Sequence, residues 1–158
     1  MSVAYVDSSA LAAIAFDEPH ASALASRMDE FDRLMSSNLL EAELRAAFMR
    51  EKLDFQESIV LGIDWVLPDR TLTPEFRTVL RAGYLRGADL WHLATALYVS
   101  SGLPRLAFAT LDAKQAEVAD ALGLACSDRT ATSATAEAAR ASSPGSPRTR
   151  SPTSRWSS

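Results

Sequence analysis

Short β-rich runs alternate with helical segments along most of this 158-residue chain. We expect strands at residues 2–7, 33–37, 106–112 and 124–128, with helical patterns between them. Two strands joined by a helix run parallel in one sheet, because the helical crossover returns the chain to the end where the first strand began. The sequence therefore predicts an α/β fold in which helices cover a mainly parallel central sheet.

Helical patterns account for most of the remaining residues up to position 124. We expect helices at residues 8–16, 20–31, 38–52, 55–66, 75–84, 88–101 and 113–124. The segment 38–52 has the clearest amphipathic pattern, and Asn38 is a suitable N-cap for it. Gly123 stands where a glycine commonly follows the end of a helix.

The composition changes near residue 130. The chain is 47% hydrophobic, and residues 1–130 hold nearly all of the apolar side chains that could form a core. Residues 131–158 are mostly Ala, Ser, Thr, Pro and Arg, and Trp156 is the one large apolar residue. Such a segment cannot bury enough surface to offset its ordering entropy. We expect one domain at 1–130 and a mostly disordered tail at 131–158, either an inert extension or a basic arm that contacts RNA.

The net charge of −4 is unevenly distributed. Four arginines against one glutamate give residues 131–158 a charge of +3, so the rest of the chain carries −7. An acidic domain is a poor general binder of nucleic acid, because contacts to phosphate rely on Lys and Arg. Carboxylates that hold metal ions would account for part of this acidity, since a bound cation reverses the local charge.

The sequence favours a cytoplasmic protein without a membrane segment. No run of about 18 consecutive apolar residues is present. The first residues, MSVAYVDSSAL, lack a basic leader and are typical of a first strand rather than a signal peptide. The single cysteine, Cys126, cannot form an intrachain disulfide.

Two aspartates follow expected strands. Asp7 ends the first strand, and Asp112 follows the strand within residues 106–112. In open parallel sheets, ligands bind outside the carboxyl ends of the strands, which is where both side chains are expected. Each aspartate alone could also be an ordinary helix N-cap.

Two further acids come from expected helices. Glu43 lies three or four residues from Leu39, Leu40 and Ala47, and therefore falls on or beside the buried stripe of its helix. Glu41 lies on the other side, spaced to pair with Arg45. A carboxylate on a core-facing stripe is unfavourable unless it is paired or bound to metal.

Asp89 opens the helix at residues 88–101, which otherwise carries almost no charge. A carboxylate in the first turn complements the helix dipole, which is the simplest explanation for Asp89 alone. Four acids expected at one edge of the sheet would, however, repel each other unless a cation neutralised them. Oxygen donors suit Mg²⁺ or Mn²⁺ better than zinc. The four acids together therefore predict a metal site for phosphodiester hydrolysis.

The segments around these acids resemble the PIN-domain family, particularly the VapC toxins of bacterial type II toxin–antitoxin systems. The resemblance is carried by VAYVDSSALAAIAFDEP, SSNLLEAELRAAF, GADLWHLATAL and FATLDAKQAEVADALGL, whose order and spacing follow the family through residues 3–125. It implies a three-layer α/β/α sandwich. It also implies a Mg²⁺- or Mn²⁺-dependent endoribonuclease that hydrolyses RNA and so inhibits translation.

The resemblance also implies roles for individual residues. Asp7, Glu43, Asp89 and Asp112 match the four acids of the family. We expect Asp7 and Asp89 to ligate the metal most directly, and Glu43 and Asp112 to act directly or through water. The family's last motif often carries a second acid after the position of Asp112, but here Ala113 and Lys114 follow. The absence of this second acid argues against a second metal site.

Three neighbouring residues are expected to assist. Ser8 and Thr110 flank the acids and could donate hydrogen bonds to carboxylates or to metal-bound water. Arg86, three residues before Asp89, could contact RNA phosphate, although a solvated helix charge is the simpler interpretation. His92 lies in an apolar helix, which favours a packed, hydrogen-bonded histidine over a metal ligand or base.

The resemblance further implies partners. The expected substrate is tRNA or rRNA. A VapB-type antitoxin would wrap the protein and insert a basic or aromatic residue into the acidic site. Such toxins usually dimerise, and residues 38–65 carry apolar side chains (Phe48, Phe55, Ile59 and Trp65) that could contribute to a homodimer.

Two other functions compete with this one. A metal-dependent phosphatase or dehalogenase-like hydrolase also uses an aspartate at the end of its first strand. That class requires a D-x-D start, whereas Asp7 is followed by Ser8 and Ser9. The second alternative is a binding module without catalytic activity, whose acidic pocket captures a basic partner. Added Mg²⁺ should stabilise an enzyme site but not a pocket for a basic peptide.

Overall fold

A computed structural model describes residues 1–126 of the chain. The strands are β1 (Val3–Val6), β2 (Arg33–Ser37), β3 (Ile63–Val66), β4 (Ala107–Ala109) and β5 (Ala125–Cys126). The helices are α1 (Ser8–Ala15), α2 (Ala21–Met28), α3 (Asn38–Arg50), α4 (Thr73–Ala82), α5 (Gly87–Ser100) and α6 (Ala113–Ala121), with a 3₁₀ turn, η1 (Glu57–Ile59). The expected domain boundary at residue 130 and the predicted disorder of 131–158 lie outside the described residues.

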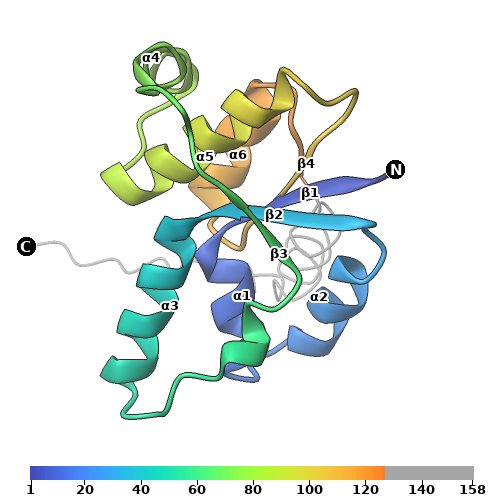
Figure 1. The fold of residues 1–158 in the computed structure, drawn as a ribbon. Helices are drawn as coiled ribbons and strands as arrows, with labels where there is room; N and C mark the ends of the chain where they lie inside the picture. The colour runs from blue at the N-terminus through green and yellow to red at the C-terminus, as the bar shows by residue number, and fades with distance from the viewer. Residues whose placement is uncertain (127–158) are drawn as a thin grey trace, which may run out of the picture. The chain divides into compact units, whose positions relative to one another are not determined.

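The five strands form one sheet in the order β3-β2-β1-β4-β5, and every neighbouring pair is parallel. Figure 1 shows α1, α2 and α3 on one face of this sheet and α4, α5 and α6 on the other. The predicted three-layer α/β/α sandwich is therefore confirmed, and the sheet is parallel throughout the described residues.

The strand order creates a switch point between β1 and β4. The chain leaves β1 toward α1 on one face and leaves β4 toward α6 on the other, so the loops after these two strands diverge. A crevice outside the carboxyl ends of the strands is the usual ligand site at such a point. The backbone N–H of Asp7 donates to the carbonyl of Ala109 (2.9 Å), which holds these two strand ends together.

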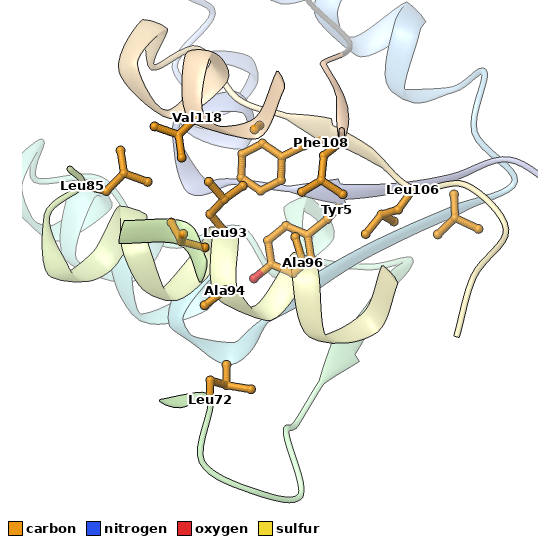
Figure 2. Packing of buried hydrophobic residues seen from close by; sticks show 13 residues of the cluster. Tyr5, Leu72, Leu85, Leu93, Ala94, Ala96, Leu106, Phe108 and Val118 are labelled. Carbon is orange, nitrogen blue, oxygen red and sulfur yellow. The ribbon is translucent and has the colours of Figure 1, made fainter. Parts of the chain in front are cut away.

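Buried apolar side chains fill both interfaces between the helices and the sheet. On the α5 and α6 side, Tyr5 of β1 stacks on Phe108 of β4 with ring centroids 5.7 Å apart. Figure 2 shows these rings together with Leu93 of α5 and Val118 of α6. Each of these four residues is at most 1% exposed. The core therefore fixes β1 and β4 together with α5, which carries Asp89, and α6, which Asp112 caps.

The second core lies under α1, α2 and α3. Its centre includes Val6, Leu11 and Leu44. The sequence did not decide whether Phe48 lies in the core or at an interface. Phe48 is 2% exposed, and its ring centroid lies 4.9 Å from that of Phe16 and 5.2 Å from that of Phe55. Phe48 is therefore a core residue. In the part of the chain that is described, no helix has the length and hydropathy needed to cross a membrane.

The predicted helix at residues 55–66 is wrong. Only η1 is helical there, and Ile63–Val66 forms β3, which pairs with β2 in the register Leu34↔Ile63. Gly62 separates the two elements at φ 87°, a left-handed conformation that ends a helix. Ile63 and Val66 are buried, and the two residues between them are exposed. This short strand therefore forms the edge of the sheet with only its two end residues packed inside.

Candidate functional site

Asp7 is the best-anchored carboxylate of the site. It caps the N-terminus of α1 and is 3% exposed. Its Oδ2 accepts hydrogen bonds from the backbone N–H of Ser9 (3.1 Å) and from the Ser9 hydroxyl (2.6 Å). The capping role and the position at the switch point therefore coincide, and the cap fixes the direction of the carboxylate.

Gln115 of α6 connects Asp7 to the opposite layer. Its Nε2 donates to Oδ1 of Asp7 (3.4 Å) and to the backbone carbonyl of Asp89 (3.3 Å). Its Oε1 accepts from the hydroxyl of Thr110 (2.6 Å), which also lies 3.2 Å from Oδ2 of Asp7. Gln115 is completely buried, so these contacts form a rigid support under Asp7.

Asp112 caps α6 at the end of the loop that follows β4. Its Oδ1 accepts from the backbone N–H of Gln115 (2.7 Å), and its own N–H donates to the Thr110 hydroxyl (3.1 Å). The side chain is exposed. One oxygen of this exposed carboxylate is therefore used by the helix cap.

Glu43 projects from α3 toward α5. Its Oε2 lies 2.8 Å from Nε2 of His92, and the Ser8 hydroxyl also hydrogen-bonds to it. Burial on its own would raise the pKa of Glu43, but the hydrogen bonds from His92 and Ser8 together leave the pKa below its usual value. Glu43 is therefore an ionised hydrogen-bond acceptor at neutral pH. Glu41 instead pairs with Arg45 at 2.7 Å, as the helix phase predicted.

A buried chain of hydrogen bonds supports Glu43 from below. The backbone N–H of Ser37 donates to the Tyr5 hydroxyl (3.1 Å), which lies 3.1 Å from Nδ1 of His92. Since the Glu43 carboxylate can only accept, His92 donates its Nε2 hydrogen to it. In the neutral ring, Nδ1 then accepts the hydroxyl hydrogen of Tyr5. His92 is completely buried, so its orientation, and with it that of Glu43, is fixed.

Asp89 experiences the combined field of the other acids. Burial raises its pKa, and the negative charges of Asp112, Asp7 and Glu43 raise it further, against a smaller lowering by His92. The charges of the three other predicted acids therefore act on Asp89. In residues 1–126, however, no three or more His, Cys, Asp or Glu side chains are grouped as they would be around a metal ion.

The remaining predicted residues lie around the same edge. Ser8 contacts Glu43, and Thr110 lies between Asp7 and Gln115. Arg86 is the exposed N-cap of α5, directly before the turn that carries Asp89.

Sequence reasoning missed Ser9 and Gln115, the two residues that hold Asp7. Both were detectable in principle. Ser9 stands two residues after a predicted capping aspartate, where a hydroxyl can reach back to the cap. Gln115 stands three residues after Asp112, which is the spacing of a capping box. What the sequence could not show is that Gln115 turns away from its own helix end and contacts Asp7, 108 residues earlier.

The Tyr5 hydroxyl provides a direct test of this buried network. Tyr5→Phe should lower the free energy of unfolding by about 1–3 kcal/mol, because the Ser37 N–H and Nδ1 of His92 both lose a partner inside the core. Urea denaturation measures the difference. Tyr98→Phe is the matched control, since the Tyr98 hydroxyl donates to Asp69 at the exposed surface (2.8 Å) and its loss should change stability by less than about 0.5 kcal/mol. Equal effects of the two substitutions would contradict the network.

Residues 4–121 match the protein family described as PIN domain. A comparison with curated proteins found no significant match. The matched range begins in β1 and ends with α6, and it includes all four acids together with Ser9, His92 and Gln115.

Proposed function

Because this chain belongs to the PIN domain family, we propose that it is a divalent-metal-dependent endoribonuclease that hydrolyses phosphodiester bonds of RNA. Membership of this family supports a nuclease. Dependence on a metal is supported by the environment of Asp89, whose pKa is raised by burial and by three other carboxylates. Such mutual repulsion is relieved when a cation lies among the acids.

The donor atoms of the site suit Mg²⁺ or Mn²⁺. All four acids offer carboxylate oxygens, which these ions prefer to nitrogen or sulfur. Residues 1–126 contain no group of three or more His, Cys, Asp or Glu side chains placed to hold an ion. Mg²⁺ keeps several waters and often takes only one or two carboxylates from the protein. We assign Asp7 and Asp89 as the most direct ligands, with Glu43 and Asp112 acting directly or through water.

The residues of the chain contribute orientation. A bound cation supplies Lewis-acid chemistry and neutralises charge on the phosphate. Asp7 is held in one direction by Ser9 and Gln115. Glu43, ionised and fixed by His92, can accept a hydrogen bond from the attacking water and align it for in-line displacement. The exposed Arg86 offers a positive charge to an RNA phosphate beside Asp89.

We further propose that this ribonuclease is the toxin of a VapC-type toxin–antitoxin system, acting on tRNA or rRNA in the cytoplasm. The segments around the four acids, which resemble those toxins, support this role. An antitoxin of VapB type would block the acidic site with an arginine, because a guanidinium group can replace the charge of the metal among carboxylates. A homodimer is part of the proposal, and the exposed Met49 (77%) and Leu53 (54%) at the end of α3 offer apolar surface for it.

Chelation tests the metal dependence. EDTA should reduce cleavage of purified tRNA and rRNA to background, and an excess of Mg²⁺ or Mn²⁺ should restore it. Mg²⁺ should also raise the free energy of unfolding of the RNA-free protein by about 2.7 kcal/mol at 100 times its Kd, and with it the midpoint of thermal unfolding, because the ion binds only the folded site. NaCl at equal ionic strength is the control. Cleavage that persists in EDTA would reject the metal mechanism, and a midpoint that ignores Mg²⁺ would favour a binding module.

A further inference from the structure

An open pocket of about 520 Å³ lies between the first turns of α3 and α5. It is lined by Asn38, Leu39, Ala42, Gly87, Ala88 and Trp91. Apart from the amide of Asn38, the lining side chains are apolar. Trp91 is joined to the network that supports Glu43 through Ser37. The proposed reaction at the four acids nevertheless assigns no role to the pocket.

The indole of Trp91 forms a fixed wall of this pocket. Its Nε1 donates to the Ser37 hydroxyl (3.2 Å), and its ring contacts that of Phe76 with centroids 6.0 Å apart. A flat aromatic surface held on two sides needs no further ordering when a ligand stacks on it. Such preorganisation favours binding, because less side-chain entropy is lost.

The pocket adjoins the acids along two helices. Ala42 directly precedes Glu43 on α3, and Ala88 directly precedes Asp89 on α5. The pocket is therefore lined by the residues next in sequence to two of the acids, and neighbouring Cα atoms are about 3.8 Å apart. The volume of about 520 Å³ is within the usual range for small planar ligands.

We propose that this pocket binds the nucleobase next to the scissile phosphate, stacked on Trp91, and thereby contributes to the choice of cleavage position. This inference rests on the proposed ribonuclease function. The charge of the site supports it, because carboxylates repel RNA phosphates and attraction to the RNA backbone cannot supply most of the affinity. Stacking of a base on an aromatic ring supplies binding without a positive charge. The base must be unpaired, so cleavage falls in single-stranded RNA or in loops.

The substitution Ala42→Leu tests the pocket without altering the core. Ala42 is exposed on α3 and lines the pocket, so a leucine there fills the space where the base would lie. Ala46→Leu is the matched control, because Ala46 is also exposed, one turn further along α3, and does not line the pocket. Both substitutions keep a good helix former.

The assay uses a single-stranded oligoribonucleotide with one cleavage position, and a series in which one nucleotide at a time lacks its base. For the unmodified protein with Mg²⁺, loss of one base next to the cleaved bond should slow cleavage roughly tenfold, and loss of the others should have little effect. The Ala42→Leu protein should cleave the intact RNA more slowly by a similar factor. Its cleavage rate should no longer depend on that base. Ala46→Leu should behave as the unmodified protein.

Binding of the same RNAs, measured by fluorescence anisotropy in EDTA, separates this inference from the proposed function. Base-dependent binding that Ala42→Leu abolishes would support the pocket even if no RNA were cleaved. If the cleavage rate depends on none of the bases, or if the Ala42→Leu protein keeps both its rate and its base dependence, the proposed base pocket is rejected. The proposed ribonuclease function would remain. Absence of both cleavage and base-dependent binding would overturn both.

Discussion

Asp7→Asn should abolish cleavage of RNA, lowering the rate by more than about 100-fold. The loss of an outer partner of a metal ligand already lowers activity about 10–100-fold, so the loss of a ligand itself should exceed that range. The substitution removes one negative charge from the centre of the site and keeps the size of the side chain. Initial rates on a defined RNA at saturating Mg²⁺ measure the effect.

The fold should tolerate this substitution. Asparagine is as good an N-cap as aspartate, and its carbonyl oxygen can accept the two hydrogen bonds from Ser9. The new amide would face Nε2 of Gln115, but that contact is long at 3.4 Å, so little favourable energy is lost. The midpoint of thermal unfolding without metal should therefore stay close to that of the unmodified protein.

Asp120→Asn is the matched control for Asp7→Asn. Asp120 is exposed on α6 and lies outside the network of the four acids. Its neutralisation should leave the rate unchanged. Full activity of the Asp7→Asn protein, purified away from host nucleases, would remove Asp7 from the site and with it the proposed mechanism.

The sheet was predictable where local patterns were unambiguous. The runs that became β1, β2 and β4 are short, β-rich and bounded by helical segments, so their parallel arrangement followed from the crossovers. β3 was missed because residues 55–66 carry apolar side chains at a spacing that also suits a helix. The deciding contacts are the left-handed turn at Gly62 and the pairing of Ile63 with Leu34, which is distant in sequence.

The residues of the site also include some that local sequence could predict and others that depend on distant contacts. Helix phase placed Glu43 beside the core and Glu41 away from it, because both depend only on residues within one helix. The support of Glu43 was not predictable, since His92 is 49 residues away from it and Tyr5 is 87 residues away from His92. Contacts of this kind arise only once both cores have packed. The predicted dimer, antitoxin and RNA target depend on surfaces beyond those contacts and stay predictions.

Asp89→Asn should stop cleavage and at the same time stabilise the metal-free protein. Two effects oppose each other at this position. A carboxylate in the first turn of α5 interacts favourably with the helix dipole, by about 0.3–1 kcal/mol at an exposed position. Burial and the charges of Asp112, Asp7 and Glu43 act in the opposite direction, and the pKa of Asp89 is raised overall. The unfavourable effects therefore prevail, and the neutral amide should raise the unfolding midpoint by a few degrees.

The pH dependence of this stabilisation follows from the raised pKa. A carboxyl whose pKa is higher in the folded state stabilises the fold below its unfolded pKa, and this contribution is lost as the pH rises through the folded value. The advantage of Asp89→Asn should therefore be small in acid, grow as Asp89 ionises, and stay constant at neutral pH. Thermal unfolding in EDTA over a series of pH values measures it, with the exposed Asp54→Asn as control.

Added Mg²⁺ should remove or reverse the advantage of Asp89→Asn, because the cation stabilises the unmodified site and has lost a ligand in the variant. This result would show that repulsion between the acids destabilises the metal-free protein and favours binding of the metal. A variant that is less stable than the unmodified protein in EDTA would mean that Asp89 serves the helix rather than the site. If the Asp89→Asn protein cleaves RNA at the normal rate, Asp89 is not a metal ligand.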